Sequence, residues 1–327
     1  MINLKMLDNF TWQKPDNNLY AIQRNSFNII GNSSLTEEQF RDKVLNGYPY
    51  MTGTFSGQQV DESSWIGQDI FVVDFDNFKF KTVKDAEKYF LNIGTDLIDA
   101  EHYKDEERPI YKKDGTPAKK VEKFWGVLPF TLEELRQKIF MYDDHWPFYK
   151  KEISNNPDNW PSQCKLYHYK CVPFFIYHSF SSCETENWRL RLLNVNRTPY
   201  CKLRAVYKVK ETITDIRLAK VIGYMLYHLF KMYGADNKSY EITHMWQGTH
   251  KDIFFTNQTY AVINEVTNVC EHFSDDFLDV YGLYQYFKTL YPNALQNNPF
   301  NFIGATRQQP SNNINYVIYE NTYYLFN

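Results

Sequence analysis

A nearly unbroken apolar run at residues 70–77 constrains the fold of this chain more than any other feature. Its order is Ile-Phe-Val-Val-Asp-Phe-Asp-Asn, and its length and β-branched and aromatic residues are typical of one buried strand. Side chains alternate between the two faces of a strand, so Asp74 and Asp76 share a face. Two buried like charges are costly unless a cation neutralises them, and Mg²⁺ and Mn²⁺ prefer such oxygen ligands. The pair predicts a metal site; the alternative is a strand end whose aspartates cap a turn or face water.

Composition limits the classes of protein to which this chain can belong. Its 327 residues suffice for one large domain or two ordinary ones, and 43% of them are hydrophobic, enough for a sizeable core. The net charge of −3 excludes a global basic field, so any nucleic-acid surface has to be a local groove. The 26 tyrosines and 25 phenylalanines fit a bulky core, and they also supply rings on which nucleobases stack.

The cysteine count and the hydropathy indicate in which compartment the protein is expected. Five cysteines, an odd number in a long chain in which we find no leader sequence, argue against a disulfide scaffold. No apolar run reaches membrane-spanning length. We therefore expect a soluble, cytoplasmic protein without a membrane partner.

The hydrophobic pattern around the acidic strand predicts an α+β fold. A long helix is expected over residues 214–233, with apolar side chains at every third or fourth position, Thr214 as its cap and Gly234 as its end. Strands and helices follow the order βαββαβ, the plan of a ferredoxin-like or RNA-recognition-like (RRM-like) palm. The expected segments are the strand at 70–77, a helix at 82–92, strands at 172–180, 188–195 and 203–209, the long helix, and a strand at 239–246.

Further segments are expected on both sides of this palm. Acidic residues in a first turn predict a helix that starts near residues 35–40, and a capping-box spacing predicts another at 131–142. The charged stretch at 104–123 is expected to be an exposed hairpin or loop. Residues 261–291 are expected to be helical in two pieces, and residues 316–326 to form two short strands.

A third acid, Asp236, directly follows the long helix. The next strand is commonly the neighbour of the first strand in a four-stranded palm, so Asp236 is expected beside Asp74 and Asp76. Three carboxylates at one sheet surface can hold two metal ions for an in-line displacement at phosphorus. The alternative is that Asp236 is only a turn residue after a helix-ending glycine.

Basic and hydroxyl side chains near the predicted strands suit a triphosphate. Arginine binds phosphate oxygens in a bidentate fork, lysine acts as a point charge, and serine donates hydrogen bonds. The alternative is that the basic residues form the solvent-exposed face of an amphipathic sheet and that the serines are ordinary loop residues. The candidates are Arg189, Arg191, Lys202 and Arg204 on the strands, and Ser179, Ser181 and Ser182 in the turn after residues 172–180.

Four segments in a fixed order carry a family resemblance. They are residues 72–77, which end in Asp-x-Asp; residues 175–182, a strand followed by a serine-rich turn; residues 202–207 with 213–215, a basic strand before a helix; and residues 235–239 followed by 246–249. In this order they resemble the archaeo-eukaryotic primase superfamily. The similarity is to the primase–polymerase domains of plasmid, phage and pathogenicity-island replication proteins, and it covers about residues 65–255.

The resemblance implies template-directed nucleotide polymerisation with Mg²⁺ or Mn²⁺ bound by Asp74, Asp76 and Asp236. It implies a catalytic domain at residues 1–255, built from N-terminal α/β elements and the palm, and a helical and short-strand extension at 256–327. The family's nucleotide-contacting histidine is replaced by Ser182, with His178 offset. Residues 184–200 look like an insertion, which makes Arg189 and Arg191 candidate template contacts.

The implied partners are single-stranded DNA and nucleoside triphosphates. No Walker-type phosphate-binding loop is present, so a replicative helicase would be a separate partner. Two other functions stay open: a replication initiator that binds origin DNA with a degenerate palm, and a metal-dependent nuclease that uses the same carboxylates. Zinc is a minor alternative to buried free thiols, because the spacing of Cys164, His168, Cys171, His178 and Cys183 is not that of paired Cys-x-x-Cys knuckles.

Overall fold

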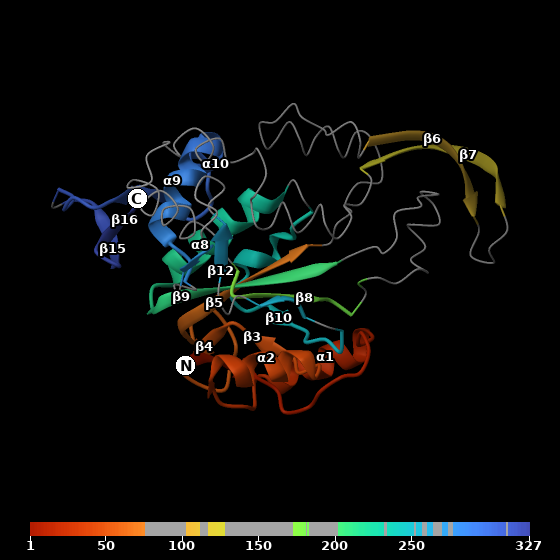
Figure 1. Cartoon of the computed structure of the whole chain (residues 1–327), viewed down its shortest axis with the longest axis horizontal. Coiled ribbons are helices and arrows are strands. Elements are labelled where there is room, and N and C mark those ends of the chain that lie inside the picture. The colour runs from red at the N-terminus through yellow and green to blue at the C-terminus, as the bar shows by residue number, and fades with distance from the viewer. Residues whose placement is uncertain are drawn as a thin grey trace.

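The chain has a mixed α+β fold built from antiparallel sheets (Figure 1). The computed structural model describes residues 1–75, 103–111, 117–127, 173–180, 182, 202–231, 234–251, 253–256, 260–263, 270–273, 277–311 and 313–327. Within 103–127 and 253–273 it describes the course of the backbone alone. The predicted helices at 82–92 and 131–142 and the predicted strand at 188–195 lie outside the described residues.

An antiparallel sheet of five strands lies at the centre of the fold. Its strand order is β11-β8-β9-β5-β4. The predicted acidic strand is present as β5, which starts earlier than expected because Trp65–Gln68 pairs with β4. The predicted strands at 172–180 and 203–209 are also present. The members are β4 (Gly53–Phe55), β5 (Trp65–Phe75), β8 (Phe175–His178), β9 (Leu203–Ile213) and β11 (Ile253–Thr256).

Each face of the central sheet has its own core. On β5, Phe71, Val73 and Phe75 belong to the core that includes the long helix α8 (Ile216–Phe230). Ile70 and Val72 belong instead to a second core shared with N-terminal elements. Because side chains alternate along a strand, Asp74 lies on the face that is turned away from α8.

A small sheet and the helix α2 (Glu37–Leu45) cover that second face, as Figure 1 shows below the central sheet. Its strand order is β10-β3-β1-β2. The helix α2 begins where the sequence predicts, because Thr36 and Gln39 form a reciprocal capping box with each other's backbone N–H. The strands are β1 (Ile2–Met6), β2 (Ser33–Leu35), β3 (Tyr50–Met51) and β10 (Met245–Trp246).

The predicted long helix is confirmed, but its cap is different. The Asp215 side chain accepts hydrogen bonds from the N–H groups of Arg217 and Leu218, so Asp215 and not Thr214 is the cap. Both residue types cap helices, and a carboxylate gains in addition from the positive end of the helix dipole. Gly234 lies just beyond the helix with a φ of 84°, a left-handed conformation that suits glycine.

The predicted strand at 239–246 is largely wrong. Asn237–Tyr240 form the 3₁₀ helix η4, and only Met245–Trp246 form a strand, which pairs with β3. Instead of the expected strand pair, the described part of this segment pairs with β5 through one antiparallel bridge between Phe75 and Ala235. The carboxylate of Asp236 caps η4, and such local side-chain hydrogen bonds compete with strand pairing.

The C-terminal elements pack into the same core as α8. Leu283 and Phe287 of α9 and Tyr324 of β16 belong to this core, and the Leu278 N–H donates to the Lys208 carbonyl of β9. The two strands expected at 316–326 are confirmed. The division of the chain at residue 255 stays a prediction. The elements are α9 (Val280–Leu290), α10 (Pro292–Gln296), β14 (Phe302–Thr306), β15 (Asn315–Tyr319) and β16 (Thr322–Phe326).

The first of the two helical pieces expected at 261–291 is wrong. Its described parts are the paired strands β12 (Tyr260–Ile263) and β13 (Cys270–Phe273), whereas the second piece is α9. Tyr260, Val262 and Ile263 favour a strand in β12, and a short apolar run does not distinguish strand from helix by period alone. The charged stretch at 104–123 is a hairpin. The remaining elements are α1 (Asn17–Ser26), β6 (Tyr103–Tyr111) and β7 (Pro117–Val127).

A buried basic pair at the end of α8 makes stability depend on pH. Burial lowers the pKa of Lys231 to about 7, and burial together with the Lys231 charge lowers the pKa of His228 to about 3. Both pKa values lie below those of the unfolded chain. The unfolded state therefore binds more protons, and stability falls as the pH drops from about 10 to 7 for Lys231, and below about 6.5 for His228.

We expect Lys231→Met to raise the free energy of unfolding near pH 7 and to flatten its dependence on pH between 7 and 10. Urea unfolding at several pH values measures both effects. Lys288→Met, on the exposed side of α9, is the control and should leave the slope unchanged. An unchanged slope in Lys231→Met would contradict the assignment of the slope to this amine.

Candidate active site

Asp74, Arg204 and Tyr177 form a row across three neighbouring strands. Asp74 of β5 lies opposite Arg204 of β9, and Arg204 lies opposite Tyr177 of β8. Directly opposed residues point to the same face of a sheet. The row therefore lies on the face turned away from α8, at the end of β5 where the predicted acidic motif begins.

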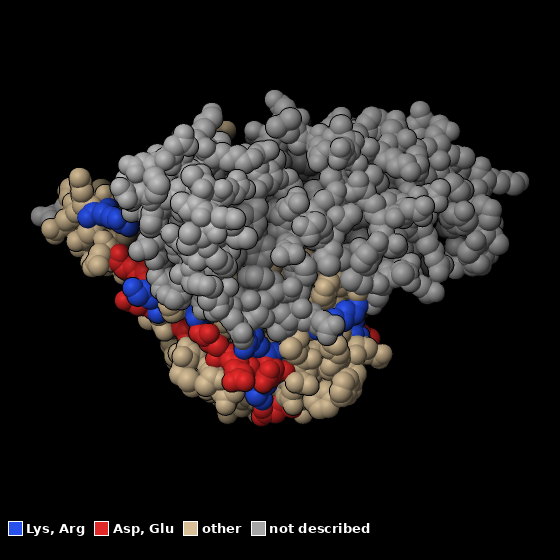
Figure 2. Space-filling model, viewed as in Figure 1, with Lys and Arg blue, Asp and Glu red and all other residues tan. Residues whose placement is uncertain are grey.

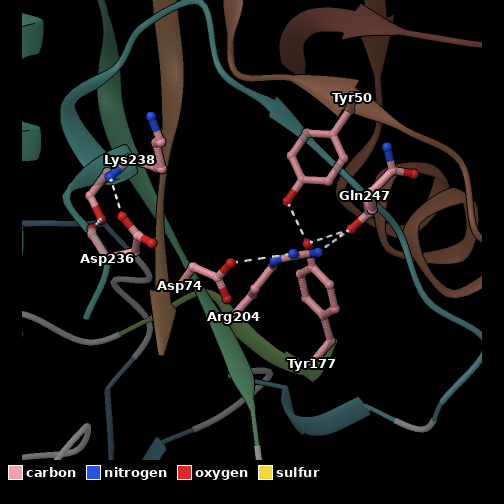
Figure 3. A network of polar contacts seen from close by, with 8 residues as sticks. Tyr50, Asp74, Tyr177, Arg204, Asp236, Lys238 and Gln247 are labelled. Atoms are coloured by element: carbon pink, nitrogen blue, oxygen red, sulfur yellow. Dashed lines mark hydrogen bonds and ion pairs between the residues drawn. The ribbon is translucent and has the colours of Figure 1, made fainter. Parts of the chain in front are cut away.

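Arg204 is held by contacts on several sides (Figure 3). Its Nη2 donates to Oδ2 of Asp74 at 3.3 Å, and its Nη1 donates to the Gln247 carbonyl at 2.7 Å. The Tyr177 hydroxyl donates to the same carbonyl at 3.2 Å and lies 2.9 Å from the Tyr50 hydroxyl. Burial acts to lower the pKa of Arg204, but the Asp74 carboxylate and the tyrosine hydroxyls outweigh it, so the pKa is raised and the guanidinium stays charged.

Asp236 meets Asp74 through the backbone. Its N–H donates to the Asp74 carbonyl at 2.8 Å, beside the bridge between Phe75 and Ala235. Its Oδ1 accepts a hydrogen bond from the Lys238 N–H at 3.1 Å (Figure 3). The expected neighbourhood of Asp74 and Asp236 is therefore present, although it comes from one bridge and not from a full strand pair. The turn-capping alternative also holds, because one carboxylate oxygen of Asp236 caps η4.

Basic side chains lie near His244, in a chain whose net charge is −3. Burial, together with the charges of Arg204, Lys238 and Arg24, lowers the pKa of His244 to about 3. His244 is therefore neutral at pH 7, chiefly because it is buried, and the charges of Arg204, Lys238 and Arg24 act in the same direction. On the face drawn in Figure 2, by contrast, the described acidic and basic side chains lie next to one another without a patch of one sign.

The turn after β8 brings several predicted nucleotide-binding residues together. The Ser182 Oγ accepts a hydrogen bond from the Lys202 N–H at 2.9 Å and lies 2.8 Å from Nδ1 of His178. The Ser179 N–H donates to the Lys202 carbonyl at 2.9 Å. Ser182 is fully buried, so in this arrangement it supports the turn, while His178 and Lys202 keep partial exposure beside it. The buried Ser179 hydroxyl has no hydrogen-bond partner within the described part of the chain.

The carboxylates of Asp74 and Asp236 are the described candidates for binding a divalent cation. Asp74 and Asp236 supply the hard oxygen atoms that Mg²⁺ and Mn²⁺ prefer, and 20% of the Asp74 side chain is exposed. Among the described residues, no group of three or more His, Cys, Asp or Glu side chains lies close enough to hold a metal ion. Asp74 and Asp236 are the two predicted ligands that the structure describes, and they meet through backbone atoms. Four predicted site residues lie outside the described residues: Asp76, Ser181, Arg189 and Arg191.

The described residues give no support to the zinc site. Of its candidates only His178 is described, and its ring contacts Ser182. The others lie outside the described residues: Cys164, His168, Cys171 and Cys183.

Sequence reasoning missed the residues that enclose Arg204. Tyr177 stood in a predicted strand, but its position opposite Arg204 depends on strand register, which no local pattern encodes. Tyr50 comes from the N-terminal sheet, and Gln247 contributes a backbone carbonyl that any residue type supplies. The Arg204 guanidinium also lies 5.8 Å from the Trp246 ring. Only the tertiary contact between the two sheets assembles this enclosure.

The position of Asp236 depends on close packing between α8 and η4. A Cβ atom at Gly223 would lie 2.4 Å from the Ser239 carbonyl oxygen and 2.8 Å from the Tyr240 Cα. Both are backbone atoms, so η4 would have to shift. We expect Gly223→Ala to lower the free energy of unfolding by about 1–3 kcal/mol, a typical cost of overpacking. Urea unfolding measures it, and Gly31→Ala, where a Cβ atom meets nothing within 4 Å, should be near neutral.

Comparison with known proteins yields no relative. No protein-family model, no curated protein and no solved structure matches this chain. Within the described residues, no helix combines the length and the apolar character needed to cross a membrane.

Proposed function

We propose that this protein is a metal-dependent nucleotidyltransferase, a DNA primase or DNA polymerase that makes or extends primers on a single-stranded template. Replication of a plasmid, phage or other mobile element is the expected setting. The observation that carries the proposal is the meeting of Asp74 and Asp236, from segments far apart in the chain, beside the charged Arg204. Nucleotidyl transfer requires such a combination of carboxylates and cations at one place.

The order of the central strands supports an RRM-like palm. The strands β8, β9 and β5 are antiparallel neighbours, with α8 on one face and the row of Asp74, Arg204 and Tyr177 on the other. The fourth strand of such a palm would border β5. In this chain β4 pairs with the start of β5, and the segment around Ala235 meets the end of β5 through one bridge to Phe75, which supports a fourth strand at that position.

Each residue of the site has a proposed role. Asp74, Asp76 and Asp236 would hold two Mg²⁺ or Mn²⁺ ions, which when bound would activate the attacking hydroxyl and stabilise charge on the departing pyrophosphate. Arg204 positions Asp74 through their ion pair. Lys202, His178 and Ser179, at the same end of the sheet, would bind phosphate oxygens. Arg189 and Arg191 would contact the template.

A template-dependent extension assay tests the proposal and separates it from its rivals. Purified protein with single-stranded DNA, nucleoside triphosphates and Mg²⁺ or Mn²⁺ should lengthen or start strands, and a chelator or the omission of template should abolish the product. Degradation of DNA without added nucleotides would identify a nuclease. DNA binding in chelator, without thermal stabilisation by nucleotides and without extension, would identify a replication initiator that only binds.

A further inference from the structure

We infer that a surface pocket in the N-terminal part of the chain binds an unpaired nucleobase of single-stranded nucleic acid. The pocket has a volume of about 260 Å³ and is lined by Phe10, Trp12, Asp42, Lys43, Asn46 and Tyr48. Pockets for drug-sized ligands start at about 300 Å³, so this one suits a single planar base better than a whole nucleoside triphosphate. The inference rests on the proposed function only in taking the base to come from a template strand.

The rings of the pocket form a stacking surface. Trp12 stacks on His250 with ring centroids 4.2 Å apart and an interplanar angle of 21°, yet 71% of Trp12 is exposed. Phe10 stands edge-on to Trp12 at 5.1 Å and is itself 44% exposed, and Tyr48 follows at 5.7 Å from Phe10. Neighbouring exposed aromatic side chains mark binding sites, and every nucleobase has a π face that can stack on them.

Backbone contacts anchor the loop that carries Trp12. The Thr11 N–H donates to the Gly47 carbonyl at 3.1 Å, and the Thr11 carbonyl is contacted by Nε2 of His250. Gly47 has a φ of 79°, and a Cβ atom there would lie 2.2 Å from the Thr11 carbonyl oxygen. These contacts fix the loop that carries Trp12, so little conformational entropy remains to be lost on binding.

Polar groups around the rings match a nucleotide. The Nζ atom of Lys43 lies 4.5 Å from the Tyr48 ring centroid, where an ammonium group can meet a backbone phosphate. Asp42 and Asn46, both exposed on the same wall, offer a carboxylate and an amide. Such groups accept or donate hydrogen bonds at the edges of bases.

The pocket is connected to the candidate active site. The ring centroid of His250, on which Trp12 stacks, lies 5.7 Å from that of Phe180 in the turn after β8. The next residue, Lys251, donates through Nζ to the Ser182 carbonyl of that turn. Through these two contacts, the residues next to the stacking surface meet the turn that follows β8.

Binding of a fluorescein-labelled oligo-dT in chelator, without nucleotides, tests the inference. Removing one stacking ring should cost about 5- to 100-fold in affinity, so Trp12→Ala should bind that much more weakly than the wild type, and Trp12→Phe should recover most of the loss. The same oligonucleotide with abasic sites should bind weakly to the wild type and should not distinguish the variants. Because Trp12 is mostly exposed, Trp12→Ala should keep its unfolding midpoint.

The outcomes separate this inference from the proposed function. Equal affinity of the wild type and Trp12→Ala, or no binding by either, overturns the stacking pocket whether or not the protein extends primers. Binding of deoxyadenosine monophosphate as tight as that of the oligonucleotide overturns the assignment to a strand. Trp12-dependent binding by a protein that shows no extension supports the pocket and removes the polymerase.

Discussion

Asp74→Asn is expected to abolish metal-dependent strand extension in a protein that still folds, although the loss of the charge that faces Arg204 lowers its stability. Partners that merely orient metal ligands cost 10- to 100-fold when removed, so the loss of a direct carboxylate ligand should cost at least about 100-fold in initial rate. Asparagine keeps the volume of the side chain and one acceptor oxygen for Arg204, whose Nη2 lies 3.3 Å from the carboxylate. Initial rates of primer extension with Mg²⁺ and with Mn²⁺ measure the effect.

Glu211→Gln is the matched control for this experiment. Glu211 lies on β9, which pairs with β5, but it is exposed near the far end of that strand, and its hydrogen bonds with Tyr319 use the Glu211 backbone N–H and carbonyl. Its rate should equal that of the wild type. Comparable extension rates in Asp74→Asn and wild type would refute a catalytic role for Asp74 and with it the polymerase proposal. Unchanged binding of single-stranded DNA by Asp74→Asn would place the defect in catalysis.

Arg204→Gln is expected to destabilise the protein by about 3 kcal/mol, the lower end of the cost of breaking a buried ion pair. Only 14% of the Arg204 side chain and 20% of the Asp74 side chain are exposed, so the Asp74 carboxylate would lose its cation in a poorly solvated place. The Gln247 carbonyl would lose its 2.7 Å donor in the same step. Urea unfolding followed by circular dichroism measures the free energy.

A double-mutant cycle shows whether this cost comes from the ion pair. In the Arg204→Gln background, Asp74→Asn no longer leaves a charge unpaired, so the double variant should be about 1–2 kcal/mol more stable than the sum of the single effects predicts. Lys220→Gln, which breaks the more exposed pair with Glu62, should cost less than about 1 kcal/mol. Additivity within about 0.5 kcal/mol in the Asp74 and Arg204 cycle would contradict the coupling.

The secondary structure that the sequence predicts well is the structure with a strong local period. The helix α8 has apolar residues at helical spacing over four turns, β5 and β8 have apolar runs of strand length, and β9 begins with alternating apolar and basic residues. Errors fall where local patterns compete. Thr214 and Asp215 are both good caps, and Asp236 prefers to cap η4 over entering a strand.

The candidate site likewise contains residues that the sequence identifies and residues that only the fold brings together. The acidic residues Asp74 and Asp236 were identifiable because they end segments with a clear period and because the palm plan makes those segments neighbours. Nothing local connects Tyr50 with Tyr177, or the Gln247 carbonyl with Arg204. The ion pair between Asp74 and Arg204 likewise depends on the register between β5 and β9.

Local residue chemistry, read along the chain, was enough to predict an α+β fold, a buried strand that carries acids, a long amphipathic helix, and basic residues nearby. Side-chain period and helix caps are properties of neighbours in the chain, which is why they can be inferred there. The enclosure of Arg204, the single bridge that holds Asp236 against β5, and the stacking of Trp12 on His250 exist only in the folded protein. Each joins residues that are distant in the chain, and strand register and sheet-on-sheet packing decide them.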